Sequence, residues 1–113
     1  MAVFDQGDVV RVPFPYTDTT VREHRPALVI STDGIEDNHG LLWLSMITSS
    51  RNRGWRGDVS VRDLRRARPP AASIGRTAKI ATIAARSATK LGSLRRANLE
   101  DVLDRIRTEL GFS

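Results

Sequence analysis

The segment Leu41-Leu42-Trp43-Leu44-Ser45-Met46-Ile47-Thr48 is almost continuously apolar. A short run of this kind, bounded by turn residues, is typical of a strand that is buried on both faces. Two earlier segments also have strand character. Residues 7–14 alternate valines with charged residues and stop at two prolines, and residues 25–32 form a β-branched run with Pro26 at its start. The sequence therefore predicts a small β protein in which residues 41–48 form a buried strand.

The segments around these three strands carry weaker signals. Residues 16–24 are polar and predict a hairpin loop, and residues 33–40 hold two glycines and an asparagine and predict a turn. Residues 58–61 alternate and predict a short strand, whereas residues 62–72 fit a helical turn or an open loop. Residues 74–85 fit a helix by their alanines and a strand by their isoleucines and threonines, so both assignments stay open.

An amphipathic helix is predicted at the end of the chain. Its apolar stripe consists of Leu99, Val102, Leu103, Ile106 and Leu110. Asn98 fits the N-cap of this helix and Gly111 fits its C-terminal stop. Five short strands followed by one helix predict a mainly β (α+β) fold, a small curled sheet or barrel plugged by the helix. The length of 113 residues predicts a single domain over residues 1–113.

The positive charge of the chain is concentrated in its second half. The net charge is +5, but residues 1–50 hold 3 basic and 7 acidic side chains, and residues 51–113 hold 15 basic and 6 acidic ones. A field of this sign attracts polyanions, so a nucleic acid or an acidic protein is the expected partner. Of the 18 basic residues, 16 are arginines, which suit bidentate phosphate contacts, although a genome rich in G and C gives the same bias.

Several classes of chemistry are excluded or disfavoured. The chain has no cysteine, which excludes a disulfide framework, a cysteine-ligated zinc and a thiol nucleophile. No segment approaches the roughly 20 apolar residues of a membrane span, and no signal peptide is recognisable, so we expect a cytoplasmic protein without membrane contact. The acidic group at residues 33–39 matches no calcium loop, and we expect no metal site there.

A nuclease that needs neither thiol nor metal can use the ribose 2′-OH as its nucleophile. The protein must then neutralise the charge that develops on the attacked phosphate, with a positioned cation and hydroxyl donors. Arg25 opens a strand after a loop and Thr48 closes a buried strand, so both stand where a rigid scaffold can present them. Taken singly, Arg25 equally fits a salt bridge at the rim, and Thr48 a hydroxyl that is satisfied by the backbone.

Three segments resemble the MazF/PemK toxins of type II toxin–antitoxin systems. They are Gly7-Asp8-Val9-Val10-Arg11-Val12-Pro13-Phe14-Pro15, then His24-Arg25-Pro26-Ala27-Leu28-Val29-Ile30-Ser31, and Thr48-Ser49-Ser50 at the close of the apolar strand. The similarity continues through residues 79–92, including a Thr89-Lys90-Leu91-Gly92 turn, into the C-terminal helix. It thus spans nearly the whole chain.

The resemblance implies a small SH3-like β-barrel of the MazF/PemK/CcdB type, often homodimeric and without a cofactor. It implies a metal-independent endoribonuclease that cuts single-stranded RNA, leaving 2′,3′-cyclic phosphate and 5′-hydroxyl ends, and that is neutralised by a separate acidic antitoxin. Arg25 and Thr48 correspond to the catalytic arginine and threonine of the family. We expect the following further residues at the RNA site: Ser49, Asp18, Glu23, His24, Arg51, Arg53, Trp55, Arg56, Lys79 and Arg86.

The role of individual groups in this set stays open. The acceptor of the 2′-OH proton is not identified, with His24, Glu23 and Asp18 as alternatives on or near one loop. Trp55 suits base stacking among arginines, but it equally fits a cap on the barrel or a contact with a second copy. Two other functions also fit the chain: a gyrase-poisoning toxin of the same fold, and a non-catalytic SH3-like module that only binds RNA.

Overall fold

The computed structural model describes residues 2–13, 23–52 and 54–112. Within these residues, six strands form one antiparallel sheet in the order β4-β5-β3-β2-β1-β6. The strands are β1 (Asp8–Pro13), β2 (His24–Val29), β3 (Leu41–Ser49), β4 (Asp58–Ser60), β5 (Ser73–Ala84) and β6 (Thr89–Ser93). The helices are α1 (Asp33–His39), α2 (Leu64–Ala67) and α3 (Arg96–Leu110), with 3-10 turns η1 (Ser50–Asn52) and η2 (Ala85–Ser87). The predicted mainly β fold with a C-terminal helix is confirmed.

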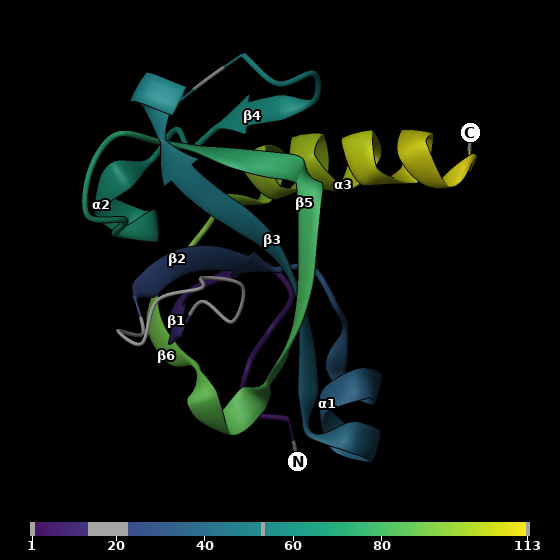
Figure 1. Ribbon diagram of the computed structural model, residues 1–113. Coiled ribbons are helices and arrows are strands. Elements are labelled where there is room, and N and C mark those ends of the chain that lie inside the picture. Colours follow the sequence, from purple (N-terminus) through teal and green to yellow (C-terminus); the bar gives the residue numbers. More distant parts are fainter. Residues whose placement is uncertain (1, 14–22, 53, 113) are drawn as a thin grey trace.

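Each face of the sheet carries a hydrophobic core, because neighbouring residues on a strand point to opposite sides and apolar residues occur on both. On β1, Val10 belongs to the core inside the curl of the sheet, whereas Val9 belongs to a second core on the other face. The stripe of α3 closes this second core, with Leu99, Val102 and Leu103 buried against it. Figure 1 shows the sheet curling around the first core while α3 lies across its outer side. In the described chain β4 and β6 are the edges and do not pair with each other, so the curl is not a closed barrel.

Strand β3 lies inside the sheet, between β2 and β5, as its apolar run predicts. Leu42, Leu44 and Ile47 are almost fully buried, but Trp43 is 49% exposed. The expectation of burial on both faces is therefore wrong at Trp43, because nothing described covers that side of β3 at this point. The partner strand β5 also settles the assignment of residues 74–85, which are strand as far as Ala84 because they pair with β3, whereas Ala85 begins the turn η2.

A large bulge interrupts the pairing of β5 with β3. Ser45 is opposite Ile80, but the next residue, Met46, is opposite Arg76, so the three residues between Arg76 and Ile80 have no partner on β3. The hydroxyl of Thr77 donates to the Gly57 carbonyl at 2.8 Å and ties this bend to the loop before β4. Bulges of this kind redirect side chains and often occur beside functional sites.

Residues 33–40 are not the turn that the two glycines suggest. They form helix α1, which ends at Gly40 in the left-handed conformation. The Glu36 carboxylate accepts the backbone N–H groups of Val3 and Phe4 at 2.9 and 3.0 Å, so a contact with a distant segment stabilises this short helix. In the described chain, no cluster of three His, Cys, Asp or Glu residues could hold a metal.

Two further assignments near the C-terminus are corrected. Residues 89–92 form strand β6, paired with β1, rather than a turn. Asn98 is not the N-cap of α3, which begins at Arg96; it lies inside the helix and is buried. Its Oδ1 accepts the Arg62 N–H and its Nδ2 donates to the Ser60 carbonyl, so these two hydrogen bonds connect α3 to the end of β4 and the residues after it. The helices of the described chain are all too short or too polar to cross a membrane.

Candidate functional site

Two predicted site residues lie near the facing ends of adjacent strands. β2 pairs with β3 in antiparallel register, and Ala27 opposite Met46 is the last pair at this end. Arg25 lies two residues before Ala27 and Thr48 two residues after Met46, and both side chains line the same pocket. Pairing of β2 with β3 thus brings together a cation and a hydroxyl that are 23 positions apart in the sequence.

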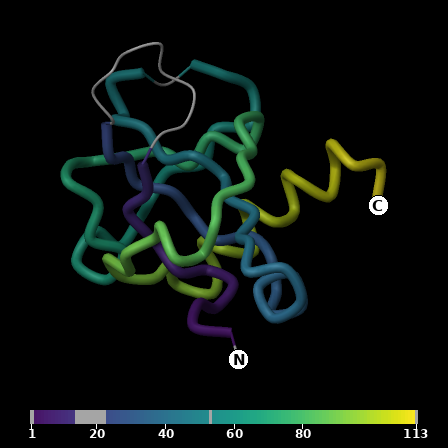
Figure 2. The backbone as a smooth tube through the Cα atoms, turned by 60° about the horizontal axis from the view of Figure 1, so that its bottom comes forward, coloured from purple at the N-terminus to yellow at the C-terminus, as the bar shows by residue number. Residues whose placement is uncertain are grey.

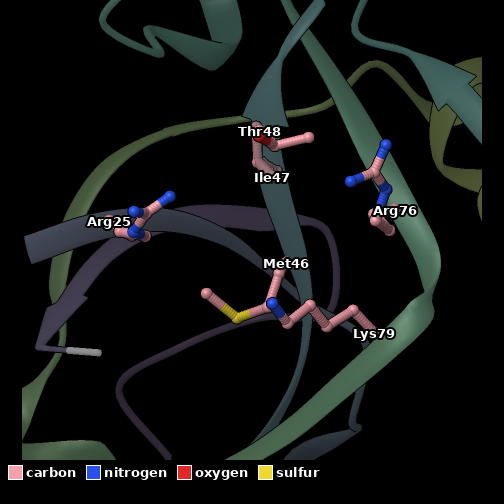
Figure 3. Close-up of a pocket in the computed structure, with 6 residues that line it drawn as sticks. All are labelled: Arg25, Met46, Ile47, Thr48, Arg76 and Lys79. Carbon is pink, nitrogen blue, oxygen red and sulfur yellow. The ribbon is translucent and has the colours of Figure 1, made fainter. Parts of the chain in front are cut away.

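A pocket of about 120 Å³ opens beside this pair. The bulge of β5 brings a second cation to it, because Lys79 lies in the bulge between Arg76 and Ile80 and lines the pocket. Figure 3 shows Arg25 on one side of β3 and Arg76 and Lys79 on the other. The pocket is lined by Arg25, Met46, Ile47, Thr48, Arg76 and Lys79. Three basic side chains around one hydroxyl form a site suited to a phosphate.

The guanidinium of Arg25 faces the acidic side chain that precedes the strand. Its Nη2 lies 2.9 Å from Oε2 of Glu23, and the two side chains are 44% and 53% exposed. Ion pairs with this exposure contribute little free energy, so an incoming phosphate can replace the carboxylate at low cost. The rim salt bridge and the phosphate-binding role are therefore compatible uses of Arg25.

Thr48 lies between the first pocket and a second hollow of about 180 Å³, to which Ser49 and Asn52 also contribute. Its Oγ1 accepts a hydrogen bond from Nδ2 of Asn52 at 3.0 Å. Asn52 is the last residue of η1, the turn that follows β3, and within this turn the Ser49 hydroxyl accepts the Arg51 N–H at 3.3 Å. The turn thus places an amide donor on the hydroxyl of Thr48.

Arg76 is a site residue that was not predicted. It is buried and forms a two-pronged ion pair with Asp58 of β4, from Nε to Oδ1 at 3.2 Å and from Nη2 to Oδ2 at 3.1 Å. Nη2 also donates to the Asn52 carbonyl at 2.6 Å, and the guanidinium carbon lies 4.2 Å from the centroid of the Trp55 ring. The sequence did carry one signal for Arg76, because it is the single arginine in a segment of small and apolar residues. A charge that is buried in such a segment needs a specific partner.

The environment of Asp58 keeps it ionised. Desolvation by burial raises the pKa of its carboxyl, but the hydrogen bond from Arg76, those from the N–H groups of Trp55 and Gly54, and the charge of Arg76 together outweigh burial and lower the pKa below its ordinary value. The resulting carboxylate holds both Arg76 and the 54–55 backbone, with Oδ2 at 3.3 and 3.1 Å from the two nitrogen atoms. This cluster joins β4, β5 and the loop after Thr48.

The remaining predicted residues are more dispersed. His24 begins β2 and is exposed, and Arg51 and Arg56 are exposed in the segment after β3 but do not line the two hollows. Trp55 is 52% exposed, yet it packs against Arg76, so one surface of the indole is already in contact with protein. Arg86 lies on η2, at the end of β5 opposite to Ser73, and lines neither hollow. Asp18 and Arg53 lie outside the described residues.

The site is formed by three strands that are neighbours in the sheet. Arg25 comes from β2, Thr48 from β3 and Lys79 from β5, and the loop after β3 borders the site. In Figure 2 the C-terminal end of α3 extends away from the rest of the backbone.

Comparisons with known proteins give the family of this chain. Residues 5–110 match the family described as PemK-like, MazF-like toxin of type II toxin–antitoxin system. Among curated proteins none matches the sequence.

Solved structures show the same fold over the full chain. A chain of the MazE–MazF complex from Deinococcus radiodurans (Form II) is 26% identical, with a TM-score of 0.76 and 100% of both chains covered. Deinococcus radiodurans MazF (Form I) is 23% identical, with a TM-score of 0.79, and 99% of this chain and 100% of that chain are covered. A mycobacterial endoribonuclease in complex with its cognate antitoxin is 17% identical, with a TM-score of 0.75 and coverages of 100% and 98%.

The matched residues include each strand and helix of the fold and both Arg25 and Thr48. Because the family match spans nearly the whole sequence, this chain belongs to the PemK-like, MazF-like toxins of type II toxin–antitoxin systems.

Proposed function

We propose that this toxin is a metal-independent endoribonuclease that cleaves single-stranded RNA, messenger RNA above all, and so stops translation and growth. The observation that carries the proposal is that Arg25 and Thr48, from the ends of two paired strands, line one pocket together with Lys79. A cation and a hydroxyl held on a rigid sheet are what transfer of a phosphoryl group to a neighbouring 2′-oxygen requires.

In the proposed reaction, the ribose 2′-oxygen attacks the adjacent phosphorus. The new bond joins O2′ to phosphorus, the bond from phosphorus to O5′ breaks, and the products are a 2′,3′-cyclic phosphate and a 5′-hydroxyl. The proton of the 2′-OH passes to a base, and O5′ takes up a proton as it leaves. No water, metal or thiol is consumed in this step.

The side chains of the pocket have separable roles in this reaction. Arg25 holds the scissile phosphate with two N–H donors and stabilises the charge that accumulates on its oxygens. Thr48 donates its hydroxyl hydrogen to a non-bridging oxygen, and Lys79 adds positive charge from β5. Glu23 and His24, which directly precede Arg25, are the described candidates for the proton acceptor. Separate Glu23→Gln and His24→Ala variants test them, and the acceptor is the residue whose replacement abolishes the chemical step.

The proposal includes a protein partner. One Deinococcus radiodurans relative is solved as a MazE–MazF complex and the mycobacterial endoribonuclease with its cognate antitoxin, and we propose a cognate acidic antitoxin for this chain. An extended acidic segment that folds on the toxin would compete with RNA for the basic side chains of the site. We also propose that the toxin acts as a homodimer in the cytoplasm.

Cleavage of a long single-stranded RNA in EDTA tests the enzymatic proposal. We expect wild-type protein to cut at defined positions and to leave cyclic phosphate ends, and we expect Arg25→Ala and Thr48→Ala to reduce cutting at least about a hundredfold. Arg107→Ala and Thr108→Ala are matched controls, because both residues are exposed on α3 far from the pocket.

Three outcomes would contradict the proposal. Binding of RNA without cleavage would identify a non-catalytic RNA-binding module, and inhibition of gyrase supercoiling without RNA cleavage would identify a gyrase poison. Cleavage that survives both Arg25→Ala and Thr48→Ala would reject the assignment of the site while leaving the enzyme class intact.

A further inference from the structure

We infer that Asn52 is a positioning residue for Thr48, and that the buried Arg76–Asp58 pair fixes Asn52 for this task. This inference rests on the proposed function, because it concerns the direction in which the Thr48 hydroxyl donates its hydrogen. It assigns a role to three residues of which none was expected at the site: Asn52, Asp58 and Arg76.

The hydrogen bond between Asn52 and Thr48 sets the orientation of the hydroxyl. Nδ2 of Asn52 donates to Oγ1 of Thr48 at 3.0 Å. A threonine hydroxyl has one hydrogen to donate and two lone pairs that accept. When a lone pair receives the amide hydrogen, the hydroxyl hydrogen must point in another direction, and Thr48 also lines the pocket that it shares with Arg25. The amide thus occupies one lone pair of the hydroxyl and leaves its hydrogen available for donation to a phosphate oxygen.

An exposed amide can orient the Thr48 hydroxyl only if the backbone that carries the amide is fixed. Here the Asn52 carbonyl accepts Nη2 of Arg76 at 2.6 Å, a short bond from a charged donor. Upstream in the same turn, the Ser50 N–H donates to the Ala72 carbonyl at 3.0 Å and ties η1 to the segment before β5. The turn is therefore held at both ends, which lowers the entropy lost when the side chain keeps one rotamer.

Arg76 in turn is held by groups that leave it little freedom. Its side chain is 10% exposed and that of Asp58 is 9% exposed, and two hydrogen bonds join them. The indole of Trp55 lies against the guanidinium at 4.2 Å, and its backbone N–H donates to Asp58. A rigid, buried ion pair thus supports an exposed amide, which supports the reacting hydroxyl. A side chain that contacts substrate keeps its productive geometry only when neighbouring hydrogen bonds and packing hold it in place.

The arrangement predicts a specific kinetic signature. Loss of the amide lets the hydroxyl rotate, which weakens a contact made in the transition state while leaving the binding of RNA to the cations unchanged. The cost is therefore expected in kcat and not in KM. If Asn52 instead contacted RNA directly, its loss would add to that of Thr48 rather than depend on it.

The test uses the full-length protein and an RNA oligonucleotide that contains one mapped cleavage site. Single-turnover rates are measured for wild type, Asn52→Ala, Thr48→Ala and the double variant, and affinity is measured with the same oligonucleotide carrying a 2′-deoxy group at the cut. Asn38→Ala, an exposed asparagine of α1, is the matched control. Thermal unfolding checks that Asn52→Ala keeps the fold.

We expect Asn52→Ala to slow cleavage about tenfold with affinity for the uncleavable oligonucleotide within about twofold, and the double variant to match Thr48→Ala alone. A wild-type rate in Asn52→Ala, a purely weakened affinity, or losses that multiply in the double variant would each overturn the inference while cleavage by wild type upholds the proposed function. A wild-type protein that leaves the RNA intact would overturn the proposed function, and this inference with it.

Discussion

Replacing Asp58 by asparagine removes the negative charge that faces the buried guanidinium of Arg76. The asparagine keeps the size of the side chain and one acceptor oxygen, so the change is mainly electrostatic. The Asp58 carboxylate accepts four hydrogen bonds, two from Arg76 and one each from the N–H groups of Gly54 and Trp55. In Asp58→Asn, the new amide would present an NH₂ group to these donors and leave a cation nearly enclosed by protein.

The structure sets the size of the expected effect. Breaking a buried ion pair by removing one partner costs about 3 to 5 kcal/mol. Both side chains are only 9 to 10% exposed, so solvent screens the pair weakly. Because asparagine keeps one acceptor, we expect the lower end, a loss of about 3 kcal/mol in the free energy of unfolding. For a domain of this size that lowers Tm by about 12 °C.

The pH dependence of stability gives a second measurement of the same pair. The pKa of Asp58 is lowered in the folded protein, so the unfolded state binds more protons as pH falls through this range. The stability that Asp58 contributes is therefore complete above its unfolded pKa, near 3.8, and is lost as pH falls through the lower folded value. The difference between wild type and Asp58→Asn should be constant above about pH 5 and should shrink below pH 3.8.

Urea unfolding followed by circular dichroism measures both quantities. Asp104→Asn is the control, because its carboxylate pairs with Arg107 on the surface of α3, where the two side chains are 70% and 49% exposed. That variant should change the free energy of unfolding by less than about 0.5 kcal/mol. A loss below about 1 kcal/mol in Asp58→Asn, or a difference from wild type that does not vary at low pH, would refute a tight pair at this position.

Three further substitutions test the packing of the fold and the charge of the site. Gly92→Ala should lower the free energy of unfolding by about 3 kcal/mol or prevent folding, because a Cβ there would lie 2.1 Å from the Arg66 carbonyl oxygen. Gly34→Ala is the control, because its Cβ would meet nothing within 4 Å, and equal Tm values of the two variants in thermal melts would contradict the close approach of β6 and α2. Leu99→Ala should destabilise by about 3 kcal/mol in urea, since Leu99 is buried between α3 and the sheet, and a loss under about 1 kcal/mol would show that α3 does not close this core. Lys79→Met should reduce the slope of log affinity against log salt for single-stranded RNA by about 0.7, and an unchanged slope would remove Lys79 from the RNA site.

The parts of the fold that could be predicted from the sequence are those with a strong hydrophobic period. The apolar run of residues 41–48 and the apolar stripe of α3 both predict burial, and residues of each pack into a hydrophobic core. Local signals without such a period were less informative. Residues 33–40 contain two glycines and were predicted as a turn, but a carboxylate contact with Val3 and Phe4 stabilises a helix there. The correct start of α3 also depended on a distant segment, because Asn98 bonds residues 60 and 62 instead of capping.

The candidate site shows the same division. Arg25, Thr48 and Lys79 could be selected because they stand at strand ends or carry charge in a small, apolar strand, and the resemblance to a family directed the choice. Asn52 could not be selected in this way, and Arg76 was marked only as a lone arginine in a small, apolar segment, since their contacts arise from a bulge of three residues in β5 and from a turn after β3. Neither feature has a period or a motif in the sequence.

The sequence by itself determined the chemistry that this protein carries: no thiol, an excess of arginine after Thr48, and a chain whose apolar pattern requires a curled sheet closed by one helix. Only the tertiary structure decided which of the many cations lie beside one hydroxyl. Pairing of β2 with β3 brings Arg25 and Thr48 to one pocket, and the bulge brings Lys79 to the same pocket, whereas Arg86 is carried to the other end of β5. The physical reason is that charge attracts RNA over many ångströms, but transition-state stabilisation requires contact within a few, which pairing between distant segments alone provides.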